Sequence, residues 1–178
     1  MFIKLVVLFF QFKMDWQTSS KVHPLVQIEC DEYVDRLKEW VKSNMVKSRS
    51  LSSTMTIYKY VHGTKVPPDA LLARGLIINR LPDTYEYVNL PIIKFHDVCR
   101  YDSDMNMYHT NIAQHISPTV QVEPKHDGTC IHAVLYRGEL IVSTSLSNKS
   151  RQSLEAYDLL KDKNWGEGIT LGLELISK

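Results

Sequence analysis

The residues with the clearest chemical potential lie between Glu123 and Gly128, in the order Glu-Pro-Lys-His-Asp-Gly. Lys125 precedes a turn that Gly128 permits, which exposes its amine at a strand or loop edge. A lysine attacks phosphorus only as the neutral amine, and its ordinary pKa of about 10.4 leaves almost none neutral at physiological pH. A site that uses Lys125 as a nucleophile must therefore favour the neutral amine, by desolvation or by nearby cations such as Mg²⁺, Lys or Arg. Asp127 would hold a ribose or orient the amine.

The same residues also fit a simple exposed turn. A K-x-D-G match arises by chance in on the order of a few per cent of chains of this length. On that interpretation Lys125 and Asp127 are solvated residues of a type I or type II turn. Neighbouring segments decide between the two interpretations.

Three further blocks accompany this motif in a fixed order. Two lie upstream, Ala73 to Ile78 (ARGLII) and Pro91 to Asp97 (PIIKFHD), and one lies downstream, Thr170 to Ser177 (TLGLELIS). With E-x-K-x-D-G at 123–128, the chain from about Thr54 onward resembles the covalent nucleotidyltransferases (polynucleotide ligases and capping enzymes), and among them the bacteriophage RNA ligase 1 family. The upstream blocks look like that family's A-R-G and P-x-x-K-F-F-N blocks. The other two are similar to its motifs I and III.

The resemblance implies a role for each matching residue around the nucleotide. Lys125 would be the nucleophile that becomes bonded to AMP, and Glu123 would face the exocyclic amine of adenine. Asp127 and Glu174 would lie near the ribose hydroxyls and the metal-bound water. Gly128 would allow the backbone close to the nucleotide.

Two cationic residues match the family positions that grip the β- and γ-phosphates, Arg74 and Lys94. A guanidinium gives bidentate phosphate contacts, and an ammonium acts as a point charge. The resemblance thus implies an ATP-dependent RNA ligase of the kind used in RNA repair, with ATP and Mg²⁺ as cofactors. Its partner would be RNA, whose 5′-phosphate is activated for joining to a 3′-hydroxyl. No residue is assigned as a metal ligand.

The chain departs from the family pattern in three places. The family's Thr-Lys-Gly-Ser run is here Thr144 to Ser147 (TSLS), so an expected phosphate-binding lysine is absent, unless Lys149 takes its place. The upstream Phe-Phe-Asn is replaced by Phe95-His96-Asp97, which keeps only one aromatic residue. The family's motifs IV and V would lie beyond Lys178.

The position of the last residue leads to an expectation of a partial adenylation domain, truncated after motif III. Such a chain would be a poor ligase by itself, and its last strand would have an unpaired outer edge. Two alternatives stay open. One is a non-catalytic or truncated nucleotide- or RNA-binding module of the same fold, and the other is a DNA ligase or capping-type enzyme.

Hydrophobic periodicity predicts the elements that position these residues. Apolar residues from Ile28 to Met45 follow the spacing of one helix face, and Ser153 to Lys161 predicts a second helix. Ser48 to Ser53 predicts a linker or loop. Runs of β-branched and aromatic residues predict strands at 54–60, 75–79, 85–89, 130–136, 139–144 and 169–176, with a tight hairpin at Arg137-Gly138. This order indicates an α+β fold with an antiparallel sheet, and the resemblance makes it an ATP-grasp-like nucleotidyltransferase domain.

Composition sets the outer limits. The chain has 178 residues, 44% of them hydrophobic and 23% charged, which suits a single globular domain or part of one. Its net charge is +1, so any basic surface must be local. Three widely spaced cysteines without a C-x-x-C pair argue against a zinc ribbon or a disulfide scaffold and favour a reducing compartment, cytoplasmic or nuclear.

The apolar run Phe2 to Phe12 is too short to span a bilayer, and no membrane partner is expected. It fits a secretory signal, a buried strand, or an extension upstream of a start at Met14. We therefore divide the chain into residues 1–13, an extension of open status, and residues 14–178, the partial RNA ligase adenylation domain.

Other potential ligands and ring systems have simpler explanations. A solvated loop explains the cluster of polar residues, which lacks standard zinc spacing: His96, Asp97, Cys99, Asp102, Asp104 and His109. Single histidines by default have structural or surface roles: His115, His126 and His132. Packing in the core or on a sheet face explains the alternating tyrosines better than stacking on bases: Tyr58, Tyr60, Tyr85 and Tyr87.

Overall fold

The computed structural model describes residues 3–8, 23–92, 101–102, 107–108, 127–163 and 165–177. The chain divides into two compact units, one formed by Met1–Ile93 with Asp127–Lys178 and the other by Lys94–His126. In the second unit, β6 (Tyr101–Asp102) pairs with β7 (Met107–Tyr108). The remaining elements belong to the first unit.

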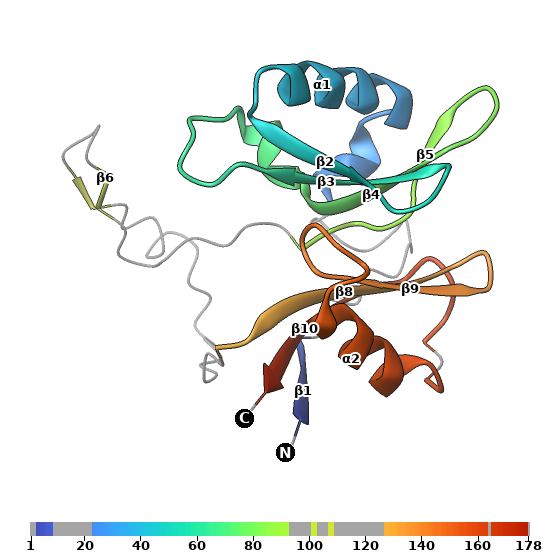
Figure 1. The fold of residues 1–178 in the computed structure, drawn as a ribbon. Coiled ribbons are helices and arrows are strands. Elements are labelled where there is room, and N and C mark those ends of the chain that lie inside the picture. Colours follow the sequence, from blue (N-terminus) through green and yellow to red (C-terminus); the bar gives the residue numbers. More distant parts are fainter. Residues whose placement is uncertain are drawn as a thin grey trace, which may run out of the picture. The chain divides into compact units, whose positions relative to one another are not determined.

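The first unit contains two antiparallel four-stranded sheets and two α-helices among its described residues (Figure 1). Sheet A has the order β1-β10-β8-β9, with bounds β1 (Ile3–Leu8), β10 (Thr170–Ser177), β8 (Thr129–Tyr136) and β9 (Glu139–Ser143). Sheet B has the order β2-β3-β4-β5, with bounds β2 (Val46–Ser50), β3 (Met55–Tyr60), β4 (Arg74–Arg80) and β5 (Tyr85–Tyr87). This mixed architecture agrees with the expected α+β class. The expectation of a single sheet is wrong: the strands form two sheets, each with a helix on its outer face and an apolar cluster shared between the inner faces.

α1 (Cys30–Lys42) covers the outer face of sheet B. Its buried residues Tyr33, Val34 and Leu37 have the spacing of one helix face, and they pack with buried residues of β2, β3 and β4. Acidic residues occupy its first turn and a lysine its last turn, which suits the helix dipole. The predicted helix over 28–45 is therefore confirmed, with ends two or three residues further in.

β2 corrects the prediction of a loop at Ser48 to Ser53. Residues 46–50 form a strand antiparallel to β3, with Ser48 opposite Tyr58 and Ser50 opposite Thr56. β2 is an edge strand, and only Val46 of its five residues is buried. Such a strand needs little apolar content, so its serine-rich composition resembles that of a loop. The turn itself is confined to residues 51–54.

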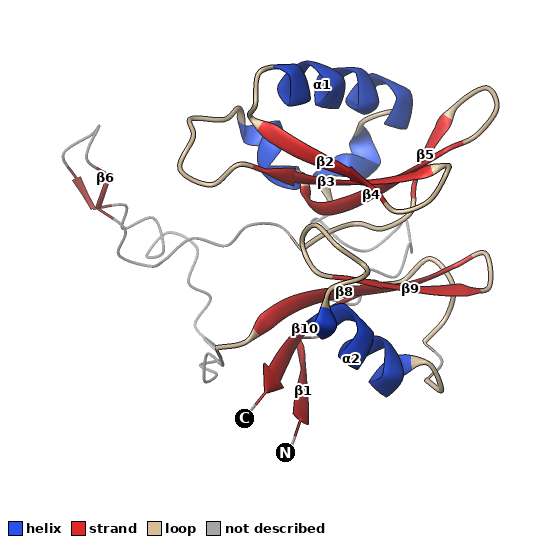
Figure 2. Cartoon of the chain, viewed as in Figure 1, coloured by secondary structure: helices blue, strands red, loops and turns tan. Residues whose placement is uncertain are grey.

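Sheet A is built around the predicted hairpin. β8 and β9 are joined by Arg137 and Gly138, whose φ angles of 51° and 76° are both positive, as a two-residue type I′ turn requires. α2 (Arg151–Leu160) packs its buried residues Ala156 and Leu160 on one face of this sheet. Ser150 caps it, since its Oγ accepts a hydrogen bond from the Ser153 backbone N at 3.1 Å. Figure 2 shows both helices lying against strands. The predicted second helix and the strands of both sheets at 54–60, 75–79, 85–89, 130–136, 139–144 and 169–176 are confirmed, with small shifts at their ends.

The outer edge of β10 is paired, contrary to expectation. β1 runs antiparallel to it from Ile3 opposite Ser177 to Leu8 opposite Gly172. Over residues 3–8 the apolar N-terminal run is thus a strand, one of the three alternatives considered for it. The expectation of an unpaired last strand is wrong, because the apolar segment at the start of the chain pairs with β10 as β1.

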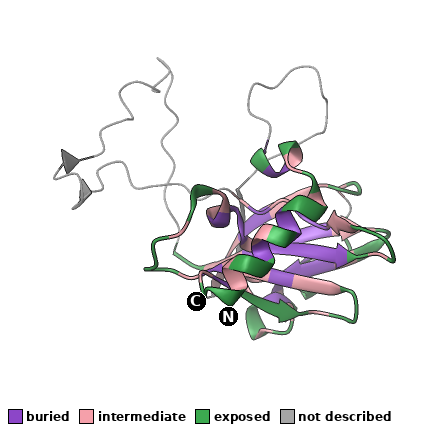
Figure 3. Ribbon diagram, turned by 90° about the horizontal axis from the view of Figure 1, so that it is seen from above, coloured by how far each residue is buried: buried purple, intermediate pink, exposed green. Residues whose placement is uncertain are grey.

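The inner faces of the two sheets share an apolar cluster. Ile57 and Ile77 of sheet B pack with Val134 and Ile141 of sheet A, and Val88 joins them. Figure 3 shows buried stretches along the strands and exposed ones in the turns. The cluster fixes the separation of the two sheets within this unit. It therefore also determines how close the strands come to each other on either side of the cluster.

A polar network closes one end of this apolar cluster. Asn79 Nδ2 donates to Tyr136 Oη at 2.8 Å and to Glu86 Oε1 at 3.1 Å. Tyr136 also donates to Glu86, and the Arg137 guanidinium forms an ion pair with the same carboxylate at 2.9 Å. The network links β4 and β5 of sheet B to the β8–β9 hairpin of sheet A.

Among the residues that the structure describes, neither α-helix is long and apolar enough to cross a membrane.

Asn89 offers a direct test of how sheet B is held together. Its side chain is 2% exposed; Oδ1 accepts from the Ile77 backbone N at 2.7 Å, and Nδ2 donates to the Gly75 carbonyl at 2.9 Å. We expect Asn89→Leu to lower the free energy of unfolding by about 2–4 kcal/mol, because two buried backbone groups lose their partners. Urea denaturation followed by circular dichroism measures this loss.

Asn44→Gly is the matched control. Asn44 is exposed and has a φ of 59°, a conformation that glycine adopts freely, so we expect a change within about 0.5 kcal/mol. Equal stability of Asn89→Leu and the wild type would contradict the structural role given to the Asn89 amide.

Candidate active site

Four of the seven predicted site residues belong to the described part of the chain: Arg74, Asp127, Gly128 and Glu174. The other three lie outside the described residues: Lys94, Glu123 and Lys125. The site is therefore built here from the first unit alone, starting with the strands that carry these positions.

Glu174 lies on β10 directly opposite Cys130 of β8. Two residues away, Gly172 is opposite His132, so these four residues share one face of sheet A. The alternate residues, including Ile131 and Leu173, pack with α2 on the other face. The acid of the TLGLELIS block therefore lies on the inner face of sheet A, which faces sheet B.

Gly128 lies against β10 at the same point. A Cβ at residue 128 would overlap the Leu175 carbonyl group and would come within 3.1 Å of the Glu174 Cγ. Only glycine lets the chain pass this close, and here the reason is contact rather than backbone conformation. The glycine of the K-x-D-G motif thus lies next to the acid of the downstream block, although 46 positions separate them (174 − 128).

The Pro91 to Asp97 block approaches the same strand. A Cβ at Gly172 would overlap the Ile92 side chain, and Leu90 N donates to Thr170 Oγ1 at 3.1 Å. The Pro91 carbonyl accepts a hydrogen bond from His23 Nε2 at 2.9 Å, which fixes the start of the block. The described part of this block, Pro91 and Ile92, therefore ends on the inner face of β10.

Arg74 comes from sheet B through a β-bulge. Between β3 and β4 the register shifts from Tyr58 opposite Leu76 to Lys59 opposite Arg74, which leaves Gly75 as the extra residue. Gly75 has a φ of 87°, and a Cβ there would lie 3.0 Å from His132 Nδ1. Backbone conformation and close approach to sheet A thus both require glycine, and the bulge brings Arg74 to the β8 end of the site.

The electrostatic effects agree with this position of Arg74. Burial raises the pKa of the Cys130 thiol, the Arg74 charge lowers it, and the Glu174 charge raises it. Burial lowers the pKa of His132 to about 4, and the Arg74 charge acts in the same direction. Arg74 and Glu174, from different sheets, therefore both influence the pKa of the Cys130 thiol.

His132 and Ser143 supply buried polar atoms next to this cation. They are opposite each other on β8 and β9, and they are 2% and 0% exposed. Within the described part of the chain, three of their atoms have no hydrogen-bond partner: both ring nitrogens of His132 and the Oγ of Ser143. The structural role expected for His132 is consistent with its burial, and its neutral ring lies under Gly75.

Sequence reasoning missed a row of cations on sheet B. Lys47 is opposite Lys59, and Lys59 is opposite Arg74, so the three side chains share the face that Ile57 also occupies. Arg49, opposite Ile57, belongs to the same face. The row extends across three strands. The sequence alone does not reveal it, because the alignment of these cations depends on the register of β2, a strand that was not predicted.

The residues that depart from the family pattern form a tight turn. Thr144 N donates to the Ser147 carbonyl at 2.8 Å, and Thr144 Oγ1 donates to the same oxygen at 3.1 Å. Ser147 Oγ accepts from Lys149 N at 3.1 Å, and the Lys149 side chain is exposed. The TSLS segment thus leads into the cap of α2.

The remaining predictions divide in a simple way. All four tyrosines pack in or against the cluster beneath α1, as expected: Tyr58, Tyr60, Tyr85 and Tyr87. The side chains of the proposed loop cluster and two of the single histidines lie outside the described residues: His96, Asp97, Cys99, Asp102, Asp104, His109, His115 and His126. Among the described residues, no group of three or more His, Cys, Asp or Glu side chains is arranged to hold a metal ion.

Comparison with known proteins adds no assignment: no protein-family model matches the chain, and no curated protein matches it.

The lowered pKa of His132 leads to a prediction of how the stability of the fold depends on pH. Its pKa falls from 6.5 to about 4 on folding, so between these values the unfolded state binds more protons and stability rises with pH. We expect His132 to contribute up to about 3 kcal/mol of this rise, which is complete above pH 6.5. Urea denaturation at pH 4.5 and pH 7 measures the difference.

In His132→Leu the difference between the two pH values should shrink. A residual difference is expected, because burial also lowers the pKa of His23. His23→Gln provides the comparison variant. If His132→Leu keeps the full pH dependence of the wild type, the buried neutral state of His132 is wrong.

Proposed function

We propose that the chain is an ATP-dependent adenylyltransferase of the RNA ligase kind, in which Lys125 forms a covalent lysyl-AMP that activates RNA 5′-phosphate ends. One observation carries the proposal. Described parts of all four sequence blocks meet at the inner face of β10 and β8: Glu174 lies on that face, Ile92 and Gly128 contact β10, and Gly75, next to Arg74, contacts His132. A chance turn at Lys125 gives no reason for this convergence.

The proposed first step is an in-line displacement at the α-phosphorus of ATP. The neutral Nζ of Lys125 forms the N–P bond, the bond to the bridging oxygen breaks, and pyrophosphate leaves with the electron pair. Most of the protein's contribution is positioning and charge stabilisation. Lys125 lies three residues before Gly128 in the sequence motif.

Arg74 and Lys59 supply the positive charge that this step needs. Both are half-buried and lie opposite each other on sheet B. A cation in such a position stabilises the leaving pyrophosphate, and it also favours the neutral form of a nearby lysine. Lys94 joins them on the strength of the sequence resemblance.

The carboxylates suit the ribose and the metal. Mg²⁺ in proteins is commonly held by one or two carboxylates together with substrate phosphates, and the resemblance implies that Asp127 and Glu174 lie near the metal-bound water. When bound, Mg²⁺ supplies charge neutralisation to the phosphates. Glu174 is half-buried beside Gly128, where a ribose hydroxyl would meet a strong acceptor.

The row of cations on sheet B supports a polyanionic partner. The whole chain has a net charge of only +1, yet Lys47, Arg49, Lys59 and Arg74 share one face. RNA carries one phosphate per nucleotide and is attracted by such a local basic surface. We place this activity inside the cell, where Cys30 and Cys130 would stay reduced.

Lys125→Ala tests the nucleophile. We expect the wild-type chain, incubated with Mg²⁺ and ATP labelled at the α-phosphate, to gain an acid-labile, alkali-stable AMP adduct, as a lysine phosphoramidate requires, and Lys125→Ala to lose it. Lys125→Arg should not rescue, because arginine stays protonated at any working pH. Denaturing gel electrophoresis with mass spectrometry of the labelled peptide measures the adduct.

Lys163→Ala is the matched control, since Lys163 is an exposed lysine just after α2. An adduct that survives in Lys125→Ala contradicts the nucleophile. ATP binding by the wild type without any adduct contradicts the enzyme and supports a non-catalytic nucleotide-binding module.

Arg74→Ala tests the assignment of the phosphate contacts. We expect lysyl-AMP formation to slow by at least about tenfold, since a charge-assisted contact to the leaving pyrophosphate is lost. Joining of pre-adenylylated RNA should be affected less, because that step contains no pyrophosphate. Single-turnover assays of the two steps separate these effects, and equal damage to both steps would contradict the assignment.

A further inference from the structure

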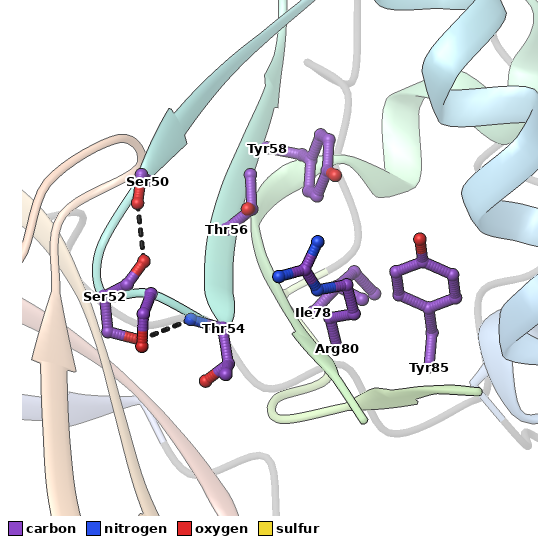
Figure 4. A pocket seen from close by; sticks show the side chains of 9 residues that line it. Ser50, Ser52, Thr54, Thr56, Tyr58, Ile78, Arg80 and Tyr85 are labelled. Carbon is purple, nitrogen blue, oxygen red and sulfur yellow. Dashed lines mark hydrogen bonds between the residues drawn. The ribbon is translucent and has the colours of Figure 1, made fainter. Parts of the chain in front are cut away.

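A second polar site lies on the other face of sheet B. A pocket of about 190 Å³ opens beside the turn between β2 and β3. Hydroxyl groups dominate its lining, and a single cation belongs to it (Figure 4): Ser50, Ser52, Ser53, Thr54, Thr56, Tyr58, Ile78, Arg80 and Tyr85.

Strand alternation separates this pocket from the candidate active site. Side chains alternate along β3. Thr56 and Tyr58 point to the outer face, which α1 partly covers, and Ile57 and Lys59 point to the inner face. α1 covers the part of the outer face near Leu76, and the pocket is the uncovered corner beside it. The two sites therefore use opposite faces of the same strands.

Arg80 is the residue that gives the pocket its charge. Its backbone N donates to the Thr54 carbonyl at 2.9 Å, and it is opposite Tyr85 at the end of β4. Its side chain is exposed, and within the described part of the chain it has no ion-pair partner. Figure 4 shows the guanidinium pointing toward the same space as the rings of Tyr58 and Tyr85.

Arg80 gives the lining of the pocket its positive charge. None of its lining residues is acidic, and Lys38 Nζ lies 5.3 Å from the centre of the Tyr85 ring. Of the acids on α1, Asp35 forms an ion pair with Lys38 at 2.9 Å, and Asp31 accepts a hydrogen bond from Tyr85 N at 2.7 Å. An anion with several acceptor oxygens fits this combination of a guanidinium and hydroxyl donors.

The size of the pocket restricts the anion further. Sites that enclose a whole small-molecule ligand have volumes of roughly 300–1,000 Å³, so about 190 Å³ is small for a free nucleotide. A phosphate group with part of its sugar fits better. The exposed positions of Ser52, Ser53 and Thr54 leave the pocket open to solvent, so that a continuous strand can pass through it.

We propose that this pocket binds a backbone phosphate of single-stranded RNA, with Arg80 on the phosphate and the ring of Tyr58 or Tyr85 beside the adjoining sugar and base. The inference rests on the RNA partner of the proposed function. The site acts on substrate binding, and it is separate from the adenylyl transfer to Lys125. Proteins that bind single-stranded nucleic acids generally combine a cationic side chain on the phosphate with aromatic rings beside the bases.

Fluorescence anisotropy with a 5′-fluorescein-labelled single-stranded RNA, without ATP, tests the inference. We expect Arg80→Ala to weaken binding by about tenfold and to reduce the slope of log K against log salt by about 1, as for the loss of one phosphate contact. Thr54→Glu, at an exposed rim position, should also weaken binding because it places a negative charge beside the phosphate. Circular dichroism verifies the folding of each variant.

Arg151→Ala is the matched control, because Arg151 is an exposed arginine on α2, where it pairs with Glu155 at 2.7 Å. It should bind RNA as the wild type does, and all of these variants should form the AMP adduct normally. Unchanged RNA affinity in both Arg80→Ala and Thr54→Glu, or an equal loss in Arg151→Ala, overturns the site. Preference for inorganic pyrophosphate or AMP as the competing ligand over unlabelled RNA would overturn it as well.

The adduct assay separates this inference from the proposed function. Loss of RNA affinity in Arg80→Ala with a normal adduct supports both. A normal adduct with RNA binding that Arg80→Ala leaves unchanged overturns the pocket alone. A normal adduct with no RNA binding by the wild type overturns the pocket and the RNA substrate together, and Arg80-dependent RNA binding without any adduct overturns the enzyme alone.

Discussion

The close approach of Gly75 to His132 is the constraint on which the rest of the site depends. Beyond the apolar cluster of Ile57, Ile77, Val134 and Ile141, the two sheets come together with only hydrogen atoms on Gly75 between the β4 backbone and the His132 ring. A Cβ at residue 75 would lie 3.0 Å from His132 Nδ1 and 3.2 Å from Ser145 Cα, so a larger side chain would require the His132 ring or the backbone to move. That one contact sets how far Arg74 lies from the inner face of sheet A.

Burial and charge at this contact reinforce each other. A cation next to an imidazole that is removed from water keeps the ring neutral, and the neutral ring in turn avoids repelling Arg74. Glu174 provides the opposite charge from β10, held in place by the backbone of Gly128. Fixed charges in a partly desolvated space interact more strongly than charges in water, so a phosphate entering here would meet an arrangement formed in advance.

Sequence reasoning succeeded where the signal is local. The periodicity of α1 and the Arg137-Gly138 turn depend on residues within a few positions, and both were predicted. It failed for β2, because an edge strand with one buried residue has the composition of a loop. The contacts of Gly75 and Gly128 join segments far apart in sequence, so spacing alone identified the glycines but not their neighbours. Lys59 was missed for the same reason, since its partner Arg74 is set by a bulge.

β3 shows why both proposed sites can exist on so small a sheet. Its inner residues, Ile57 and Lys59, belong to the face that the four sequence blocks approach, whereas Thr56 and Tyr58 belong to the pocket on the outer face. The period of two in a strand makes these sets independent, so a substitution on one face leaves the other's side chains in place. The link that remains is the backbone of β3 and β4. Since Asn89 holds that backbone at Gly75 and Ile77, both sites require the same two buried hydrogen bonds, although they share no side chain.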